Sequence, residues 1–457
     1  MRNHDKLKLV EHWVKIPFVI IRRAQRIRGH LEMPGDKSIS HRAAIIGALA
    51  NGTSQIKHFS TSQDCAATLR CLTQLGVAIR RDGSDILVEG IGRDGFRAPT
   101  EPLDCGNSGT TMRLLAGILA GQKFESTLTG DESLRSRPMQ RIIEPLTMMG
   151  ATVSSADGHA PLTIKGRQPL KAIDYELLVA SAQVKSCILL AGLNAGGRTR
   201  VVEDQPTRDH TERMLRWFGV SIETGEGGKE NERFSAVQGP AMFQGRDVTV
   251  PGDISSAAYF IAAAALTNDS SLEIESVGLN PTRALFLKQL QSFGFHVDVE
   301  NVREECNEPR GTIQVEGTRR SSPAVDSESL LTLHSALIPQ LIDELPLLAV
   351  VGSQITGGIE IRDAAELRVK ESDRIAATVA GLRAMGAEVE EFDDGLRISG
   401  PMLLSGAQID SRGDHRVAMT FAVAGLIAEG ETEIKGAECV AVSFPEFFDL
   451  LELVVER

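Results

Sequence analysis

Residues 111–128 read TMRLLAGILAGQKFESTL, and residues 146–153 read LTMMGATV. The first stretch begins as an apolar helix rich in Ala and Leu and ends as a strand. The second is the end of another helix, followed by another strand. Gly150 lies within the second stretch, between the end of the helix and the start of the strand. Glycine readily adopts the left-handed backbone that closes many helices. Together the stretches predict a helix, a strand, a second helix and a second strand in one folding unit.

The same pattern occurs six times along the chain. The other copies of the first stretch are residues 41–56, 183–202, 255–274, 344–361 and 415–434. A glycine closes the second helix in five copies, at Gly76, Gly150, Gly219, Gly294 and Gly386. The period is about 70 residues, longer than the roughly 20–50 residues of helical solenoids and propeller blades. Each repeat therefore has the size of a βαβαβ unit, and the predicted fold class is α/β.

Three repeats precede residues 250–252 and three follow them. Because 457 residues are too many for one core, we expect two similar lobes of three repeats, with a substrate cleft between the lobes. The sixth repeat reaches the C-terminus without its final strand, which residues 20–33 can supply. The chain would then cross between the lobes near Gly35 and near Gly252.

The predicted domains follow from this arrangement. They are an N-terminal extension of residues 1–21, a discontinuous first lobe of residues 22–36 plus 252–457, and a second lobe of residues 37–251.

Composition narrows the class of function. A net charge of −12 and an aromatic content of 4% argue against nucleic acid as a partner. Residues 13–21 are largely apolar, but Lys15 and Pro17 interrupt them, so they predict neither a signal peptide nor a membrane span. The six cysteines are scattered without a CxxC pair, as in a reducing compartment. We expect a cytoplasmic protein, and a monomer because no apolar heptad demands a partner.

The repeats differ most in the segment just before the first helix: residues 35–38, 106–110, 181–183, 252–255, 342–344 and 413–416. Small and hydroxyl residues there leave helix N–H groups available at the positive end of the dipole, where anions bind. Ordinary N-capping explains any one segment. It does not explain the cations nearby, which are Lys37, Arg42, Arg113, Arg137, Lys185, Arg208, Lys370, Arg374 and Arg416. Such a set suits a substrate with two phosphates, or with a phosphate and a carboxylate.

Two acidic residues, Asp343 and Glu371, lie in short polar windows between apolar segments. Glu371 is either a charge on a solvated helix face or a carboxylate that passes a proton beside an anionic substrate. The surroundings of His210 and His415 lack HxxxH or HxxE spacing, so we expect no metal site. The GDKS at residues 35–38 lacks the upstream glycine of a nucleotide P-loop.

From Arg22 to the C-terminus the chain closely resembles the 5-enolpyruvylshikimate-3-phosphate synthase family. The motifs that carry the resemblance are PGDKSISHR at 34–42, GNSGT at 106–110, RPM at 137–139, SAQVKS at 181–186, DE at 343–344, RVKESDR at 368–374, DHR at 414–416 and SFPEF at 443–447. SAQ at 181–183, RDHTE at 208–212 and NPTR at 280–283 are similar to the second of the family's two sequence classes.

The resemblance implies a reaction between two anionic substrates, without a metal or organic cofactor. The enolpyruvyl group of phosphoenolpyruvate passes to the 5-hydroxyl of shikimate 3-phosphate, and phosphate is released. The implied fold is two lobes of three βαβαββ repeats that close on the substrates. The residues implied for shikimate 3-phosphate are Lys37, Ser38, Arg42, Ser181, Gln183, Arg208, Asp343 and Lys370. Those implied for phosphoenolpyruvate are Lys37, Gly109, Arg137, Gln183, Arg374 and Arg416.

Asp343, Glu371 and Lys37 are the expected catalytic residues. Addition of an alcohol to an enol ether needs one group to protonate the methylene carbon and another to accept the hydroxyl proton. Glu371 suits the first role and Asp343 the second, while Lys37 can neutralise the departing phosphate.

Two positions are of interest within the family. The first sequence class has a Lys where this chain has Val442, to which we assign no role. Some herbicide-tolerant members that resemble the second class have Ala in place of Gly109. We therefore expect glyphosate to compete with phosphoenolpyruvate here, and Gly109→Ala to relieve the inhibition.

Two rival functions stay open at this point. One is the enolpyruvyl transferase that acts on UDP-N-acetylglucosamine, which uses a loop cysteine; Cys105 is the candidate, although a buried structural cysteine is the expected role. The other is a noncatalytic sensor of phosphorylated metabolites, which would need the cations but not Glu371 and Asp343.

Overall fold

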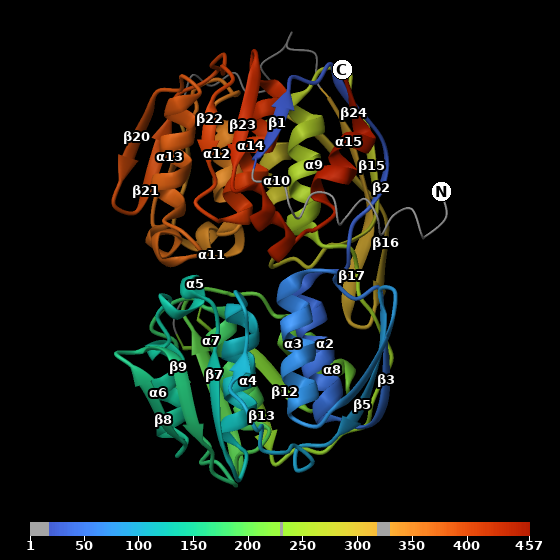
Figure 1. Cartoon of the computed structure of the whole chain (residues 1–457), viewed down its shortest axis with the longest axis vertical. Helices are drawn as coiled ribbons and strands as arrows, with labels where there is room; N and C mark the ends of the chain where they lie inside the picture. The colour runs from blue at the N-terminus through green and yellow to red at the C-terminus, as the bar shows by residue number, and fades with distance from the viewer. Residues whose placement is uncertain (1–17, 229–231, 318–329) are drawn as a thin grey trace. The chain divides into compact units, whose positions relative to one another are not determined.

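The computed structural model describes residues 18–228, 232–317 and 330–457, which form two compact units (Figure 1). The first unit contains the described residues up to Pro34, Gly252–Arg303, and those from Pro309 to the C-terminus. The second unit contains Gly35–Pro251 and the short segment Glu304–Glu308. The predicted first lobe included that short segment, whereas its contacts group it with the second unit.

The second unit contains three four-stranded sheets. In each, a short edge strand runs parallel to the strand that follows the first helix of a repeat, and an antiparallel hairpin completes the sheet. In spatial order the strands are β14 (Val248–Thr249), β3 (Asn51–Lys57), β5 (Asp85–Ile91) and β4 (Ala78–Asp82); β6 (Leu103–Asp104), β7 (Glu125–Thr129), β9 (His159–Lys165) and β8 (Thr152–Ala156); and β10 (Asp174–Glu176), β11 (Gly197–Glu203), β13 (Arg233–Gly239) and β12 (Ile222–Glu226).

The first unit also contains three sheets, with more variation. In spatial order they are β18 (Leu331–Leu333), β19 (Ile359–Ile361), β21 (Gly395–Ile398) and β20 (Val389–Phe392); β1 (Phe18–Arg22), β23 (Glu431–Lys435) and β22 (Gln408–Asp410); and β16 (His296–Glu305), β17 (Glu308–Glu316), β15 (Ser271–Gly278), β2 (Arg26–Glu32) and β24 (Val455–Glu456). The described residues thus contain one sheet for each of the six predicted repeats.

The N-terminal segment completes the sheet of the sixth repeat. Strand β1 pairs antiparallel with β23, in a register that runs from Phe18 opposite Lys435 to Arg22 opposite Glu431. The prediction that residues 20–33 supply this strand is confirmed for its first residues, and β2 from the same stretch joins the sheet of the fourth repeat. Of the predicted extension, residues 1–17 lie outside the described part, and 18–21 belong to β1.

The first helix of each repeat forms the interior of its unit. These helices are α2 (Lys37–Leu49), α4 (Gly109–Ala120) and α7 (Ala182–Gly192) in the second unit, and α9 (Ile254–Leu266), α12 (Leu345–Gly352) and α14 (His415–Ile427) in the first. Almost every residue of α9 and α14 is buried. Helices that are apolar on all sides are expected in a core, and the long Ala- and Leu-rich runs produce such helices.

The second helices are shorter and mostly have one buried face. They are α3 (Gln63–Gln74), α6 (Gln140–Met148), α8 (His210–Trp217), α10 (Leu285–Ser292) and α13 (Arg374–Ala384), with α15 (Phe447–Val454) near the C-terminus. The five predicted closing glycines all have positive φ, between 83° and 97°. The prediction of left-handed helix ends is therefore confirmed. Among the described residues, no helix combines the length and the apolar character that crossing a bilayer requires.

Candidate active site

Helix N-termini gather in the second unit, where the sequence analysis expected anion sites. The caps of α2, α4 and α7 are Asp36, Ser108 and Ser181, whose side-chain oxygens accept hydrogen bonds from backbone N–H groups of the first turn. Side chains at neighbouring helix starts contact each other: Gln183 of α7 donates to Thr110 of α4 at 2.8 Å, and Lys37 of α2 pairs with Asp64 of α3 at 2.8 Å. These helix starts therefore lie close together within one unit.

Lys37 forms an ion pair that the sequence did not reveal. It is the first residue of α2, and its Nζ lies 2.8 Å from Oδ2 of Asp64 near the start of α3. The side chains are 20% and 10% exposed, so the pair is only partly solvated. Asp64 therefore holds the ammonium group of Lys37 in place at the helix start.

Gln183 connects α7 to α4. Its Oε1 accepts a hydrogen bond from Arg113 Nη1 at 2.6 Å, and its Nε2 donates one to Thr110 Oγ1 at 2.8 Å. Arg137 donates to Asn107 Oδ1 at 2.6 Å. A methyl group added to Gly109 would lie 2.7 Å from Arg113 Nη1 and 3.5 Å from Arg137 Nη1. The structure thus brings together Gly109, Arg137 and Gln183, three of the residues implied for phosphoenolpyruvate.

Arg42 is more deeply embedded than a typical ligand residue. It is 3% exposed, and its guanidinium donates to Ser38 O at 2.9 Å, Thr211 Oγ1 at 2.7 Å and Ser186 Oγ at 3.0 Å. Burial lowers its pKa to about 10. Arg42 therefore joins α2, α7 and α8, and it keeps Ser38 beside it.

Lys185 has a structural environment. Its ammonium group is 1% exposed and lies 2.9 Å from Glu203 Oε1 and 2.8 Å from Glu212 Oε1. Lys185 was predicted to be one of the converging cations, but its charge is neutralised by two buried glutamates of the same unit. This interpretation of Lys185 was wrong, because the sequence does not reveal such long-range partners.

Arg374 is the centre of the charged group in the first unit. Its guanidinium lies 2.5 Å from Glu371 Oε2, 2.8 Å from Asp414 Oδ2 and 3.5 Å from Asp343 Oδ1. It is only 1% exposed. One buried arginine thus contacts both predicted proton-transfer residues.

Arg416 of α14 approaches one of these carboxylates, that of Asp343. Its Nη2 lies 3.4 Å from Asp343 Oδ2, and its Nη1 donates to the backbone oxygen of Asp343 at 3.0 Å. Asp414, the cap of α14, accepts from Arg416 N at 2.9 Å while its side chain also pairs with Arg374. Asp414 was missed as a site residue, although its place in the DHR motif beside Arg416 was the available signal.

The electrostatics of this group follow from burial and opposite charge. Burial alone would lower the pKa of Arg374, but Asp414 and Glu371 outweigh it and raise that pKa above its usual value. Burial would raise the pKa of Asp414, yet Arg374 holds it below its usual value. For Lys370, burial lowers the pKa despite the neighbouring Asp343. Burial would also lower the pKa of Arg416, but Asp343 and Glu344 outweigh it and raise that pKa above its usual value, so both arginines stay charged beside carboxylates.

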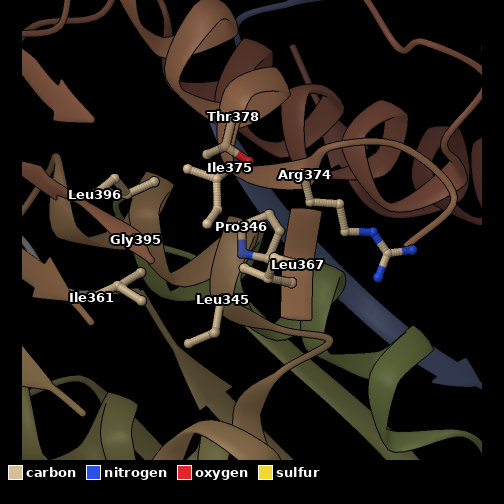
Figure 2. A pocket seen from close by; sticks show the side chains of 9 residues that line it. All are labelled: Leu345, Pro346, Ile361, Leu367, Arg374, Ile375, Thr378, Gly395 and Leu396. Atoms are coloured by element: carbon tan, nitrogen blue, oxygen red, sulfur yellow. The ribbon is translucent and has the colours of Figure 1, made fainter. Parts of the chain in front are cut away.

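A small pocket lies behind Arg374 (Figure 2). Its lining is mostly apolar, with Leu345, Ile361 and Leu396 among the side chains, and the Arg374 guanidinium extends away from them. The pocket thus offers little to an anion. Arg374, Ile375 and Thr378 of α13 belong to this lining.

Cys105 does not have the environment of a nucleophile. Its side chain is buried, and a hydrogen bond with Cys71 together with burial raises the pKa of its thiol well above the usual value. Reactive cysteines have lowered pKa values and partial exposure. The expected structural role of Cys105 is therefore confirmed by its surroundings.

Comparisons with known proteins show the family to which the chain belongs. The family model described as EPSP synthase (3-phosphoshikimate 1-carboxyvinyltransferase) matches residues 21–451. A 3-phosphoshikimate 1-carboxyvinyltransferase of Koribacter versatilis is 52% identical over 96% of this chain and 99% of its own length, and one of Desulfitobacterium hafniense is 48% identical over 94% and 96%. A solved EPSP synthase from Acinetobacter baumannii is 41% identical with a TM-score of 0.81, and the match covers 96% of this chain and 98% of that one. The chain therefore belongs to the EPSP synthase family, the 3-phosphoshikimate 1-carboxyvinyltransferases.

Proposed function

We propose that Glu371, Asp343 and Lys37 carry out the chemistry of this family, in which enolpyruvyl passes from phosphoenolpyruvate to the 5-hydroxyl of shikimate 3-phosphate. The observation that carries the proposal is the contact of Arg374 with Asp343, Glu371 and Asp414 at 2.5–3.5 Å. When an incoming anion binds a cation that several carboxylates share, the pKa values of those carboxyl groups rise.

Each substrate would be bound by charged and polar side chains. For shikimate 3-phosphate, we propose Lys37, Ser38, Arg42, Ser181, Gln183, Arg208, Asp343 and Lys370. For phosphoenolpyruvate, we propose Lys37, Gly109, Arg137, Gln183, Arg374 and Arg416. Planar guanidinium groups suit both carboxylate and phosphate because they can donate two parallel hydrogen bonds. Arg113, which donates to Gln183, would hold that amide in position.

Substrate binding would prepare Glu371 to act as an acid. When an anionic substrate takes the donors of Arg374, Glu371 loses its cation and gains a negative neighbour, so it binds a proton more readily. It then protonates the methylene carbon, while the 5-hydroxyl oxygen attacks the adjacent carbon and its proton passes to Asp343. The bond between the attacked carbon and the bridging phosphate oxygen then breaks, and phosphate leaves beside Lys37. The methyl group returns one proton to the Glu371 carboxylate, which restores the double bond.

Release of phosphate tests the reaction directly. Purified protein given shikimate 3-phosphate and phosphoenolpyruvate together should release phosphate, whereas either substrate alone should release none. UDP-N-acetylglucosamine in place of the shikimate substrate is a further control. Tight binding without turnover would instead identify a sensor, and turnover of the UDP-sugar would identify the other transferase.

Gly109→Ala should weaken inhibition by glyphosate. The added methyl lies 2.7 Å from Arg113 Nη1, so the arginine end must move, and with it the hydrogen bond to Gln183. Loss of one charge-assisted hydrogen bond corresponds to roughly 10–100-fold in affinity. We expect the inhibition constant of glyphosate to rise by about that factor, with a smaller rise in the KM of phosphoenolpyruvate. Inhibition kinetics at several phosphoenolpyruvate concentrations measure both.

The matched control for this variant is Gly228→Ala, where an added methyl meets nothing within 4 Å. It should leave both constants unchanged. An unaltered inhibition constant in Gly109→Ala would show that glyphosate does not bind beside Gly109.

We further propose that the enzyme acts as a cytoplasmic monomer without nucleic-acid or membrane partners. The net charge of −12 disfavours both polyanions and anionic lipid surfaces. Light scattering coupled to size exclusion should give a mass near 49.3 kDa.

A further inference from the structure

The segment Glu304–Glu308 joins the second unit although the chain on both sides of it belongs to the first. It is the tip of the β16–β17 hairpin, whose turn residues Cys306 and Asn307 have φ of 55° and 62°. Two consecutive positive φ values are typical of the tight type I′ hairpin turn, which favours Asn and Gly. Cys is an unusual choice there, so its side chain requires a separate explanation.

The contacts of Cys306 provide that explanation. It is 9% exposed and is part of the hydrophobic core of the second unit. Its Sγ accepts a hydrogen bond from Thr249 N at 3.4 Å. The turn is therefore anchored in the second unit by a side chain that packs into the core.

The residues beside Cys306 bind the start of α8. Asn307 Nδ2 donates to Arg213 O at 3.2 Å, and Arg213 Nη1 donates to Asn307 O at 3.0 Å. Glu308 Oε1 lies 2.7 Å from His210 Nδ1, with side chains 3% and 2% exposed. Removal of either partner is energetically costly, because it leaves the other buried polar group without a hydrogen bond.

Arg208 lies two residues before His210, in the loop that leads into α8. Thr207 directly precedes Arg208. Its backbone N–H and its hydroxyl donate to Glu203 Oε2 at 3.2 Å and 2.6 Å. Arg208 is therefore bracketed by two buried glutamates, Glu203 within the unit and Glu308 from the hairpin tip. The first fixes the residue before it, and the second fixes the start of the helix after it.

We infer that His210 and Glu308 are positioning residues for Arg208, so that the hairpin tip sets the affinity of the enzyme for shikimate 3-phosphate. The inference rests on the proposed role of Arg208 in binding that substrate. Neither residue takes part in the chemistry. Their loss should therefore weaken binding of shikimate 3-phosphate and leave turnover at saturation nearly unchanged.

Glu308→Ala tests this inference, and Glu308→Gln is the conservative variant. We expect Glu308→Ala to raise the Kd and KM of shikimate 3-phosphate by about tenfold, with kcat and the KM of phosphoenolpyruvate within twofold of the unmodified enzyme. Glu308→Gln can still accept the His210 hydrogen bond and should recover most of the affinity. Glu304→Ala, at an exposed position of the same tip, should change nothing.

The readouts separate the possible failures. Phosphate release by the unmodified enzyme establishes the reaction first, and its absence would overturn the proposed function. If that enzyme is active but Glu308→Ala lowers only the melting temperature, with unchanged affinity for shikimate 3-phosphate, the tip is merely structural and the inference is wrong. Should Glu308→Ala not fold, an unchanged affinity in His210→Ala would overturn it equally.

Discussion

Glu371→Gln is expected to lower kcat by about 10²–10⁴-fold, the usual contribution of a general acid. The amide keeps the size of the side chain and can still accept a hydrogen bond from Arg374, whose Nη2 lies 2.5 Å from Oε2 in the unmodified protein. It cannot deliver a proton to carbon. Binding of shikimate 3-phosphate, measured by calorimetry, should stay within a few fold because that substrate is held by other groups.

A second carboxylate of the same unit serves as the matched control. Glu391 on β20 pairs with Arg368 at 3.1 Å, and Glu391→Gln should leave kcat unchanged. Retention of more than a tenth of the activity in Glu371→Gln would mean that another group supplies the proton.

Arg374→Lys should lower enzyme activity nearly as much as Glu371→Gln, for a different reason. Lysine keeps the positive charge beside Asp414, so the variant should fold, but an ammonium group cannot reach Glu371, Asp414 and Asp343 as the planar guanidinium does. Two hydrogen bonds to charged groups, worth about 1.5–3 kcal/mol each, correspond to about 10²–10⁴-fold. We expect that loss in kcat/KM for phosphoenolpyruvate, measured from initial rates at saturating shikimate 3-phosphate.

Arg383 in the last turn of the same helix provides the comparison. It donates to Val389 O at 2.8 Å and 3.1 Å, and Arg383→Lys should leave the kinetics unchanged. Circular dichroism of both variants would establish that helix α13 is intact. A kcat/KM for Arg374→Lys within threefold of the original would show that phosphoenolpyruvate does not depend on this guanidinium.

Local sequence signals predicted much of the fold. Five glycines close their helices in the left-handed conformation. Asp36, Ser108 and Ser181 cap the helices that the preceding small and hydroxyl residues predicted. Such features depend on a few neighbouring residues, so they can be read directly from a single sequence.

Ion-pair partners that are distant along the chain could not be predicted from the sequence. Asp64 lies 27 residues after Lys37, and Asp414 lies 40 residues after Arg374. In sequence Lys185 resembles a site cation, but in the structure it forms ion pairs with Glu203 and Glu212. Whether a charge serves a substrate or a buried ion pair depends on tertiary packing, which composition and periodicity do not specify.

The hairpin tip illustrates the same limit. In sequence, residues 303–328 are only a charged and polar stretch, but in the structure Glu308 contacts His210, 98 residues earlier. Nothing local distinguishes Glu308 from the other acidic residues around it. The roles of the site residues stay predictions, to be decided by the variants described above.

The pairing of β1 with β23 has a consequence for synthesis of the protein. Arg22 and its partner Glu431 are 409 residues apart, so at about 5–20 residues per second the ribosome needs roughly 20–80 s between them. During that interval the first strand lacks its pairing partner while the whole of the second unit is synthesised. An unmatched strand edge is prone to wrong associations. Chaperones that hold the nascent N-terminus should therefore matter more for the yield of this enzyme than for a protein whose terminal strands pair locally.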